Sequence, residues 1–252
     1  MRIIRHIISK NFIMKTEDEI KSLVEKTIHQ DFTFSETHHV EDKLVSQDQL
    51  EAIIVVSNVL HVCINQMTAI IDSQGKRAAA KIFRLYRQVI QKFAELTQAY
   101  FEIYDSCSFL LIYPGPHEEA PKAVKRAMQL THILTDSLKA YAKQFNQMDF
   151  AIGIDHGRIL GTNEGRIIWQ GMCIEKAKKI SEMCLKPYRI GISRMVYSIL
   201  EENDKVITKH ILGMIPQKEE IWLRNSYDFA NAHRHFYVTK HTEAYEPQEN
   251  ID

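Results

Sequence analysis

The sequence predicts an α+β fold in which helices cover one face of an antiparallel sheet. Two observations carry this prediction. Segments with the apolar pattern of strands are interrupted by segments of helical period, and their order along the chain is β-α-β-β-α-β. This order is the ferredoxin-like, split βαβ arrangement, to which a further β-rich region is added at the C-terminal end.

The first strand, the first long helix and a hairpin make up the first half of the predicted core. Residues 52–60 are continuously apolar and rich in β-branched side chains, which is typical of a strand buried on both faces. Residues 76–96 repeat apolar side chains every three or four positions and predict an amphipathic helix. Residues 100–104 and 109–113 predict two strands joined by a turn that begins at Asp105.

The second half continues the alternation of strands and helices. The longest periodic segment predicts a helix that has a proline in its first turn, a position that proline favours. A turn is expected at residues 155–157, between two short strands. The expected elements are a helix at 121–145, strands at 150–154, 158–161 and 167–169, a helix at 172–184, a strand at 188–193 and a helix at 195–202.

The two ends of the chain extend this core. Residues 15–29 predict an amphipathic helix with acidic residues in its first turn, and residues 30–50 predict a polar loop with room for a short strand. Residues 208–240 alternate apolar and polar side chains and predict additional strands. Translation is compatible with a start at Met1 or at Met14, which precedes the helical pattern.

Charge and composition limit the classes of function. The 32 basic residues are balanced by 32 acidic ones, which argues against a protein that holds nucleic acid through phosphate contacts. No apolar run approaches the roughly 20 residues that cross a bilayer, so no membrane association is expected. The four cysteines form no CxxC pair. We therefore expect a soluble cytoplasmic protein with reduced thiols.

A resemblance to a known family rests on the order of several short motifs. Residues 151–161 read Ala-Ile-Gly-Ile-Asp-His-Gly-Arg-Ile-Leu-Gly and are followed by Trp169-Gln-Gly171 and by a helix carrying Ala177 and Lys179. Asp105 lies where the family has Gly-Asp. Over residues 50–200 the chain thus resembles the class III adenylate and guanylate cyclases. Its motifs are most similar to those of the Pycsar-type pyrimidine cyclases of bacterial antiviral defence.

The resemblance implies an architecture and a set of ligands. Residues 51–204 would form the nucleotide-cyclase-like domain, residues 1–50 an N-terminal helical extension and loop, and residues 205–252 a C-terminal β extension and tail. Cyclases of this class act as dimers with sites shared at the interface, so the resemblance implies a homodimer or pairing with an active partner. A nucleoside triphosphate is the implied ligand. No cofactor is otherwise indicated, but Mg²⁺ or Mn²⁺ would accompany a bound nucleotide.

The first metal-binding carboxylate of the family has two candidate positions here. Asp72 resembles the family's Asp-x-x-Gly, but the residues before it form a poor strand. The better strand, at 52–60, places Asn58 at the metal position and leaves space for a loop and a long helix before Asp105. An amide supplies one negative charge fewer than a carboxylate, which weakens the binding of a hard cation. Asp105 itself is also a typical first residue of a hairpin turn.

Other functional positions of the family are replaced as well. The transition-state Asn and Arg fall on Glu175, which repels phosphate, and on Lys179, which keeps the charge but loses the bidentate fork. The base-reading positions fall on Phe101 and Ile168, which cannot hydrogen-bond a base edge.

These replacements predict a degenerate cyclase-like protein that acts as a non-catalytic nucleotide-sensing or regulatory module in signalling. The alternative is an active cyclase with altered ligands, which makes a cyclic nucleoside monophosphate, for example a pyrimidine one in antiviral defence.

Overall fold

The computed structural model describes most of the chain, and all structural statements below concern those residues. They are residues 19–26, 28, 33–37, 51–65, 67–137, 149–163, 167–184, 187–209 and 217–239. The helix expected at 15–29 is present over residues 19–26, and the strand allowed for in the following segment is β1, Thr33–Thr37. Among the described residues, no helix is long and apolar enough to span a membrane.

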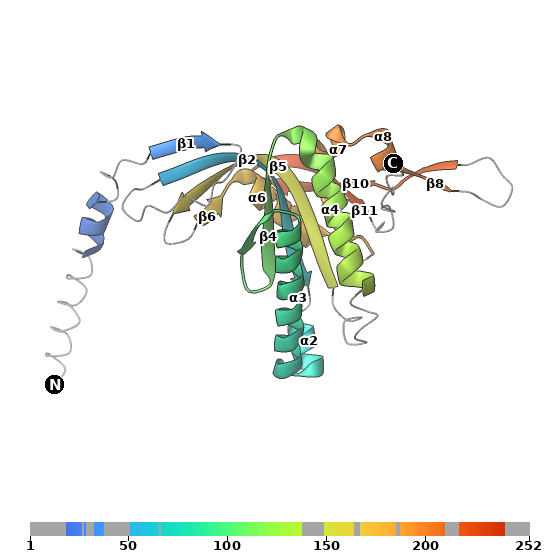
Figure 1. The fold of residues 1–252 in the computed structure, drawn as a ribbon, viewed down its shortest axis with the longest axis horizontal. Coiled ribbons are helices and arrows are strands. Elements are labelled where there is room, and N and C mark those ends of the chain that lie inside the picture. The colour runs from blue at the N-terminus through green and yellow to red at the C-terminus, as the bar shows by residue number, and fades with distance from the viewer. Residues whose placement is uncertain are drawn as a thin grey trace.

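A mixed sheet of nine strands forms the centre of the molecule (Figure 1). Seven strands follow one another in the order β10-β11-β7-β5-β2-β4-β3, while β1 pairs with β2 and β6 with β5. Neighbours are antiparallel except for the pairs β1–β2 and β5–β7. The strand bounds are β2 Glu51–Asn65, β3 Tyr100–Ile103, β4 Ser108–Pro114, β5 Asp149–Asn163, β6 Ile167–Gln170, β7 Ile190–Ser193, β10 Leu223–Phe229 and β11 Ala232–Thr239.

Two long strands, β2 and β5, form the middle of this sheet. They pair without interruption from Ala52 opposite Thr162 to Asn65 opposite Asp149. The turn expected at residues 155–157 is therefore absent, and that prediction was wrong. Gly157, read as a turn residue, instead allows Cys173 to approach the strand, because a side chain there would begin 3.2 Å from the Cys173 Cβ.

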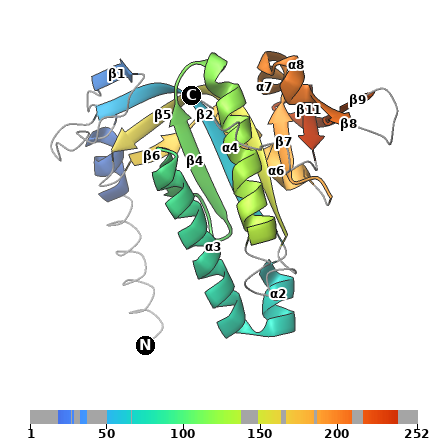
Figure 2. The same ribbon diagram turned by 45° about the vertical axis from the view of Figure 1, so that its right-hand side comes forward.

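The helices α3 (Lys76–Leu96) and α4 (Ala120–His132) cover one face of the sheet (Figure 2). The bounds of α3 are those that the periodicity predicts. Tyr86 and Ile90 of α3 and Leu130 of α4 pack against alternate side chains of β2 and β5 in the largest hydrophobic cluster. This burial of apolar surface is the main source of stability for the domain. We call this side of the sheet the α3/α4 face.

The helix α6, Met172–Met183, lies on the opposite face of the sheet. Its residues Ile174 and Ala177 pack against Val55 and Val59 of β2 in a second cluster. The expectation that helices cover a single face was therefore incomplete. Gly153 of β5 makes this contact close, because a Cβ there would lie 1.9 Å from the Ala177 carbonyl oxygen and 2.6 Å from the Ser181 nitrogen.

The remaining elements differ from the sequence predictions mainly in length. The helix expected at 121–145 is α4, followed by a π-helical segment at Ile133–Ser137, and residues 138–148 lie outside the described part. The helix expected at 195–202 is divided into α7 and α8. The other elements are α2 Met67–Gln74, a 3₁₀ turn at His117–Glu119, α7 Arg194–Ile199, α8 Glu202–Lys205, β8 Val206–Lys209 and β9 Gln217–Glu220.

Candidate functional site

The turn between β3 and β4 presents Asp105 at the surface beside the end of β2. The Ile64 nitrogen of β2 donates a hydrogen bond of 2.9 Å to the Cys107 carbonyl oxygen, which fixes the turn against that strand. One carboxylate oxygen of Asp105 accepts a hydrogen bond of 2.8 Å from the Cys107 nitrogen. Asp105 therefore acts locally as the residue that closes the turn. Partial burial raises the pKa of Asp105, but the Cys107 N–H, the Ser108 side chain and the nearby Lys178 together outweigh it, so the pKa lies below its ordinary value.

His61 is a buried β2 side chain that interacts electrostatically with Asp105. It is 1% exposed and lies on the α6 side of the sheet, where its Nδ1 is 2.7 Å from the Ser181 hydroxyl of α6. Its ring meets the Tyr104 ring edge-on at 5.5 Å between centroids. Within the described part of the chain, its Nε2 is buried without a hydrogen-bond partner.

The buried environment keeps the His61 imidazole neutral. Burial lowers the pKa of His61 to about 4, Lys178 adds to this effect, and Asp105 opposes it. At neutral pH the group beside Asp105 is therefore an uncharged ring, whereas a cation site needs anionic oxygen.

The outer side of α6 supplies the other charged groups around this turn. The Tyr104 hydroxyl donates a hydrogen bond of 2.8 Å to Glu175, and the Lys178 ammonium lies 4.9 Å from the centre of the Tyr104 ring. Burial and the bond to Glu175 raise the pKa of Tyr104 to about 12. Lys179 follows on the same helix with a half-buried side chain. Glu175, Lys178, Tyr104 and Asp105 thus form a mixed-charge surface, which we call the hairpin-side surface.

Three of the sequence-predicted site residues lie on the α3/α4 face instead. Asn58 is buried in β2, opposite Tyr113 of β4, and its amide oxygen is 3.1 Å from Nδ1 of His156. Phe101 stacks on Phe109, with ring centroids 5.7 Å apart, within the α3/α4 cluster. The structure therefore does not bring Asn58 or Phe101 together with Asp105.

Ile168 is the third of these residues on the α3/α4 face. Its neighbours Ile167 and Trp169 pack in the α6-side cluster, so the alternation of side chains along β6 turns Ile168 to the other face. Asp72, the rejected metal position, is exposed on α2 rather than at the end of a strand.

The α6 side of the strands carries residues that the sequence interpretation missed. The sequence does not point to His61, because the continuous apolar run ends at residue 60, whereas β2 continues to Asn65. Tyr100 and Trp169 face α6 with ring centroids 6.0 Å apart, one position away from Phe101 and Ile168. A shift of one residue changes the face of a strand, so counting the period of two from Val59 would have pointed to His61.

A pair of divalent cations does not fit the residues present at the turn. Asp105 already accepts a hydrogen bond from its own turn, the neighbouring strand offers His61 in place of a carboxylate, and Lys178 places a positive charge nearby. The described residues also contain no group of three or more His, Cys, Asp or Glu side chains able to hold a metal ion. The turn therefore supplies a single carboxylate.

Comparisons with known proteins support the fold. No protein-family model matches the chain, and no curated protein sequence is significantly similar to it. Among solved structures, the adenylyl cyclase CyaB from P. aeruginosa is similar with a TM-score of 0.56 and 13% identity, over 81% of this chain and 100% of that one. A bacterial light-regulated adenylyl cyclase is similar with a TM-score of 0.57 and 11% identity, over 75% of this chain.

The chain spans 52% of that light-regulated cyclase. A third similar structure is a class III adenylyl cyclase-like ATP-binding protein from Pseudomonas aeruginosa, with a TM-score of 0.54, 16% identity, and coverage of 69% of this chain and 40% of that one. The sheet order, the helices on both faces and these similarities define the class: the chain has the fold of class III nucleotide cyclase domains.

Proposed function

We propose that the chain is a non-catalytic, cyclase-like module that binds a nucleoside triphosphate and regulates a signalling partner. The observation that carries this proposal is His61, a buried neutral side chain in the place where a second carboxylate would have to meet Asp105. Cyclisation needs the ribose 3′-oxygen to be activated and the phosphates to be neutralised, which two cations held by paired carboxylates accomplish. One exposed carboxylate engaged in its own turn does not supply that pair.

The charges on α6 support the same proposal. Glu175 carries negative charge where a triphosphate would have to pass, and its hydrogen bond to Tyr104 holds it there. Lys178 and Lys179 supply positive charge, but an ammonium group is a point charge without the fork that a guanidinium offers to phosphate. Such a surface can attract a nucleotide without stabilising the transition state of its cyclisation.

Nucleotide binding by a cyclase-like protein has a precedent among the similar structures. One of them is described as a cyclase-like ATP-binding protein, so the fold is compatible with nucleotide binding as a function. A homodimer is part of the proposal, because the chain has the fold of class III cyclase domains and one similar structure is described as a dimeric guanylyl cyclase domain.

The proposal is tested with the purified full chain and each of the four common nucleoside triphosphates, with Mg²⁺ or Mn²⁺. We expect at least one triphosphate to raise the thermal midpoint, and no cyclic monophosphate to appear by mass spectrometry above the level of Asp105→Ala. A cyclic product whose formation depends on Asp105 would overturn it, and so would the absence of binding by every triphosphate.

An active cyclase with altered ligands is the second candidate. It is favoured by the lowered pKa of Asp105. The Cys107 N–H, the Ser108 side chain and Lys178 together outweigh the effect of burial and leave an exposed, ionised carboxylate at the tip of the turn. In that case the same assay yields a product, for example a cyclic pyrimidine nucleotide, and Asp105→Ala abolishes it.

A further inference from the structure

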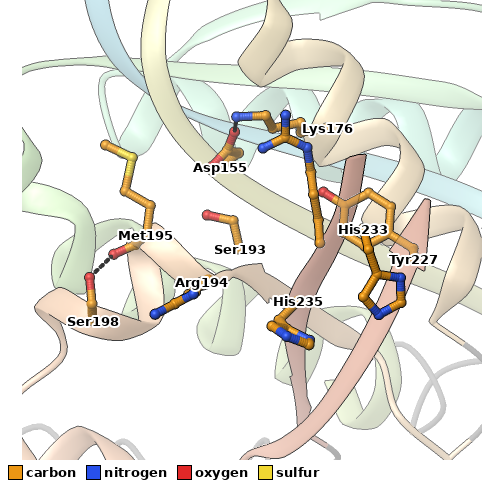
Figure 3. Close-up of a pocket in the computed structure, with 10 residues that line it drawn as sticks. Asp155, Lys176, Ser193, Arg194, Met195, Ser198, Tyr227, His233 and His235 are labelled. Atoms are coloured by element: carbon orange, nitrogen blue, oxygen red, sulfur yellow. Dashed lines mark hydrogen bonds and ion pairs between the residues drawn. The ribbon is translucent and has the colours of Figure 1, made fainter. Parts of the chain in front are cut away.

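A pocket of about 540 Å³ lies on the other side of α6 from Asp105. It is bounded by α6, by the end of β7 and the beginning of α7, and by the β10–β11 hairpin (Figure 3). Its volume falls within the range of roughly 300–1,000 Å³ that is usual for small-molecule sites. We call it the β11 pocket.

A buried carboxylate forms one wall of the β11 pocket. Asp155 is 1% exposed, and among the described residues neither of its oxygens has a partner within hydrogen-bonding distance. The Lys176 ammonium lies 3.6 Å from one of them, and the Ser193 hydroxyl lines the same wall. Burial raises the pKa of Asp155, and this effect exceeds that of Ser193 and Lys176, which lower the pKa. A buried acceptor without a close donor is costly unless a ligand supplies one.

Apart from Asp155, the formally charged residues that line the pocket are the cations Lys176, Arg194 and Arg234. Lys176 partly neutralises Asp155, whereas Arg194 and Arg234 have no ion pair in the described part of the chain. The Arg234 side chain is held by the Phe229 carbonyl oxygen at 3.5 Å and lies over the Phe229 ring. Figure 3 shows Arg194 and His235 across the pocket from the pair of Asp155 and Lys176.

Asp228 of β10 pairs with a histidine of the lining and not with either arginine. Asp228 is bonded to His233, with 3.0 Å between Oδ1 and Nδ1. The formal charges of the whole chain cancel, so two unpaired guanidinium groups in one concavity are a local feature. Clustered positive charge in a concave site concentrates anions there.

We propose that the β11 pocket binds a small phosphate ester, with the phosphate on Arg194 and Arg234 and a hydrogen-bond donor of the organic part on Asp155. Guanidinium groups match phosphate geometry through paired N–H donors. The carboxylate can accept only from an N–H or O–H, so it selects a ligand that carries such a group. This site stands apart from the hairpin-side surface and does not depend on the proposed nucleotide site there.

Nucleoside 5′-monophosphates are suitable probes, because they join a phosphate to a ring with N–H donors. Calorimetry on the full chain, without metal and at low ionic strength, would compare AMP, GMP, CMP and UMP with inorganic phosphate. We expect one or more of the four to bind at least tenfold more tightly than inorganic phosphate.

A matched pair of variants then tests the arginines. R194Q/R234Q removes two charges from the pocket, and R84Q/R87Q removes two from the exposed side of α3 on the opposite face. We expect R194Q/R234Q to weaken binding at least tenfold and R84Q/R87Q to leave it within about twofold. Equal effects of the two pairs would show a general charge effect and overturn the proposal.

Asp155→Asn tests the donor contact in a second way. In this variant we expect the nucleoside monophosphate to bind no more tightly than inorganic phosphate. Inorganic phosphate itself should bind the variant at least as tightly as it binds the wild type. If the variant fails to fold, the imidazole resonances of His233 and His235 in the wild-type chain provide the readout. Resonances that do not move during the titration, or no binding by any of the phosphate compounds, would contradict the site.

Discussion

The two sides of α6 differ in how their charges are arranged. On the hairpin side, Glu175 is hydrogen-bonded to Tyr104, Lys178 lies over the same ring, and Asp105 caps its own turn. On the pocket side, the buried Asp155 has no partner within hydrogen-bonding distance among the described residues and pairs with Lys176 at 3.6 Å, while Arg194 and Arg234 of the lining form no ion pair there.

On the hairpin-side surface the charged groups are engaged by contacts within the protein. In the β11 pocket, charged groups remain that a ligand could bind. Successive residues of one helix serve the two sides: Glu175 faces the hairpin, and Lys176 reaches Asp155. The fold alone therefore does not identify the working surface, because function depends on which side chains remain free to bind. The variants below test this contrast in order of decreasing expected effect.

Gly153→Ala should have the largest effect, because it acts on both sides of α6 at once. A methyl group there would lie 1.9 Å from the Ala177 carbonyl oxygen, so the helix must move away from β5. We expect a loss of about 3 kcal/mol or more in the free energy of unfolding, measured with urea. Gly157→Ala is the matched control, since its nearest contact is the Cys173 Cβ at 3.2 Å and its expected cost is clearly smaller. Equal losses of unfolding free energy in the two variants would show that α6 does not contact β5 closely at Gly153.

The pH dependence of stability tests the buried state of His61. Burial lowers its native pKa to about 4, against about 6.5 in the unfolded chain. Above pH 6.5 both states are neutral, and between pH 6.5 and 4 only the unfolded state takes up the proton. The stability that His61 confers is thus lost as pH falls through this window, by up to roughly 3 kcal/mol.

His61→Phe should remove this component of the pH dependence. The variant loses the bond to Ser181, at a cost of about 1 kcal/mol at pH 7, and its stability should fall less between pH 7 and 4.5 than that of the wild type. The exposed His117→Asn is the control and should follow the wild type. Parallel curves for His61→Phe and wild type would mean that His61 is not buried as a neutral ring.

Substitutions of Asp105 distinguish a turn residue from a metal ligand. Asparagine retains an oxygen that can accept the bond from the Cys107 nitrogen, so Asp105→Asn should keep most of the stability. Asp105→Ala should lose about 1 kcal/mol in urea unfolding. If Mn²⁺ raised the stability of the wild type but of neither variant, Asp105 would have to be assigned as a ligand.

The smallest effect is expected for Tyr104→Phe. The variant removes the hydrogen bond to Glu175 at the surface but keeps the ring beneath Lys178 and beside His61. Its free energy of unfolding should change by no more than about 0.5–1 kcal/mol. A much larger loss would show that the hairpin-side surface is a structural network rather than a local contact.

The sequence predicted most of the fold because its periodic signals are strong. The amphipathic pattern defined α3 to the residue, and the paired apolar runs defined the hairpin of β3 and β4 to within one residue. The turn expected at residues 155–157 failed because Asp and Gly are usual turn residues. In this chain Asp155 lines a pocket and Gly157 allows a close contact with α6, both within a continuous strand.

The site was less predictable, because its geometry depends on which face each strand residue occupies. Matching short motifs placed Asn58, Phe101 and Ile168 in the site, and a shift of one residue along a strand moves a side chain to the other face. Glu175 lies on the helix that the sequence predicted at residues 172–184, and its role in the site stays a prediction. The β11 pocket has no local motif at all, because it joins residues from β5 to β11 that only the folded sheet brings together.

The most direct measurement of the central claim is electron paramagnetic resonance of Mn²⁺ with the full chain and a saturating nucleoside triphosphate. A turn whose only carboxylate is Asp105, beside a neutral His61, should add no protein-bound Mn²⁺ beyond the ion that the triphosphate itself carries, and Asp105→Asn should give the same spectrum as the wild type. Two Mn²⁺ ions per chain in the wild type, reduced in Asp105→Asn, would contradict the account.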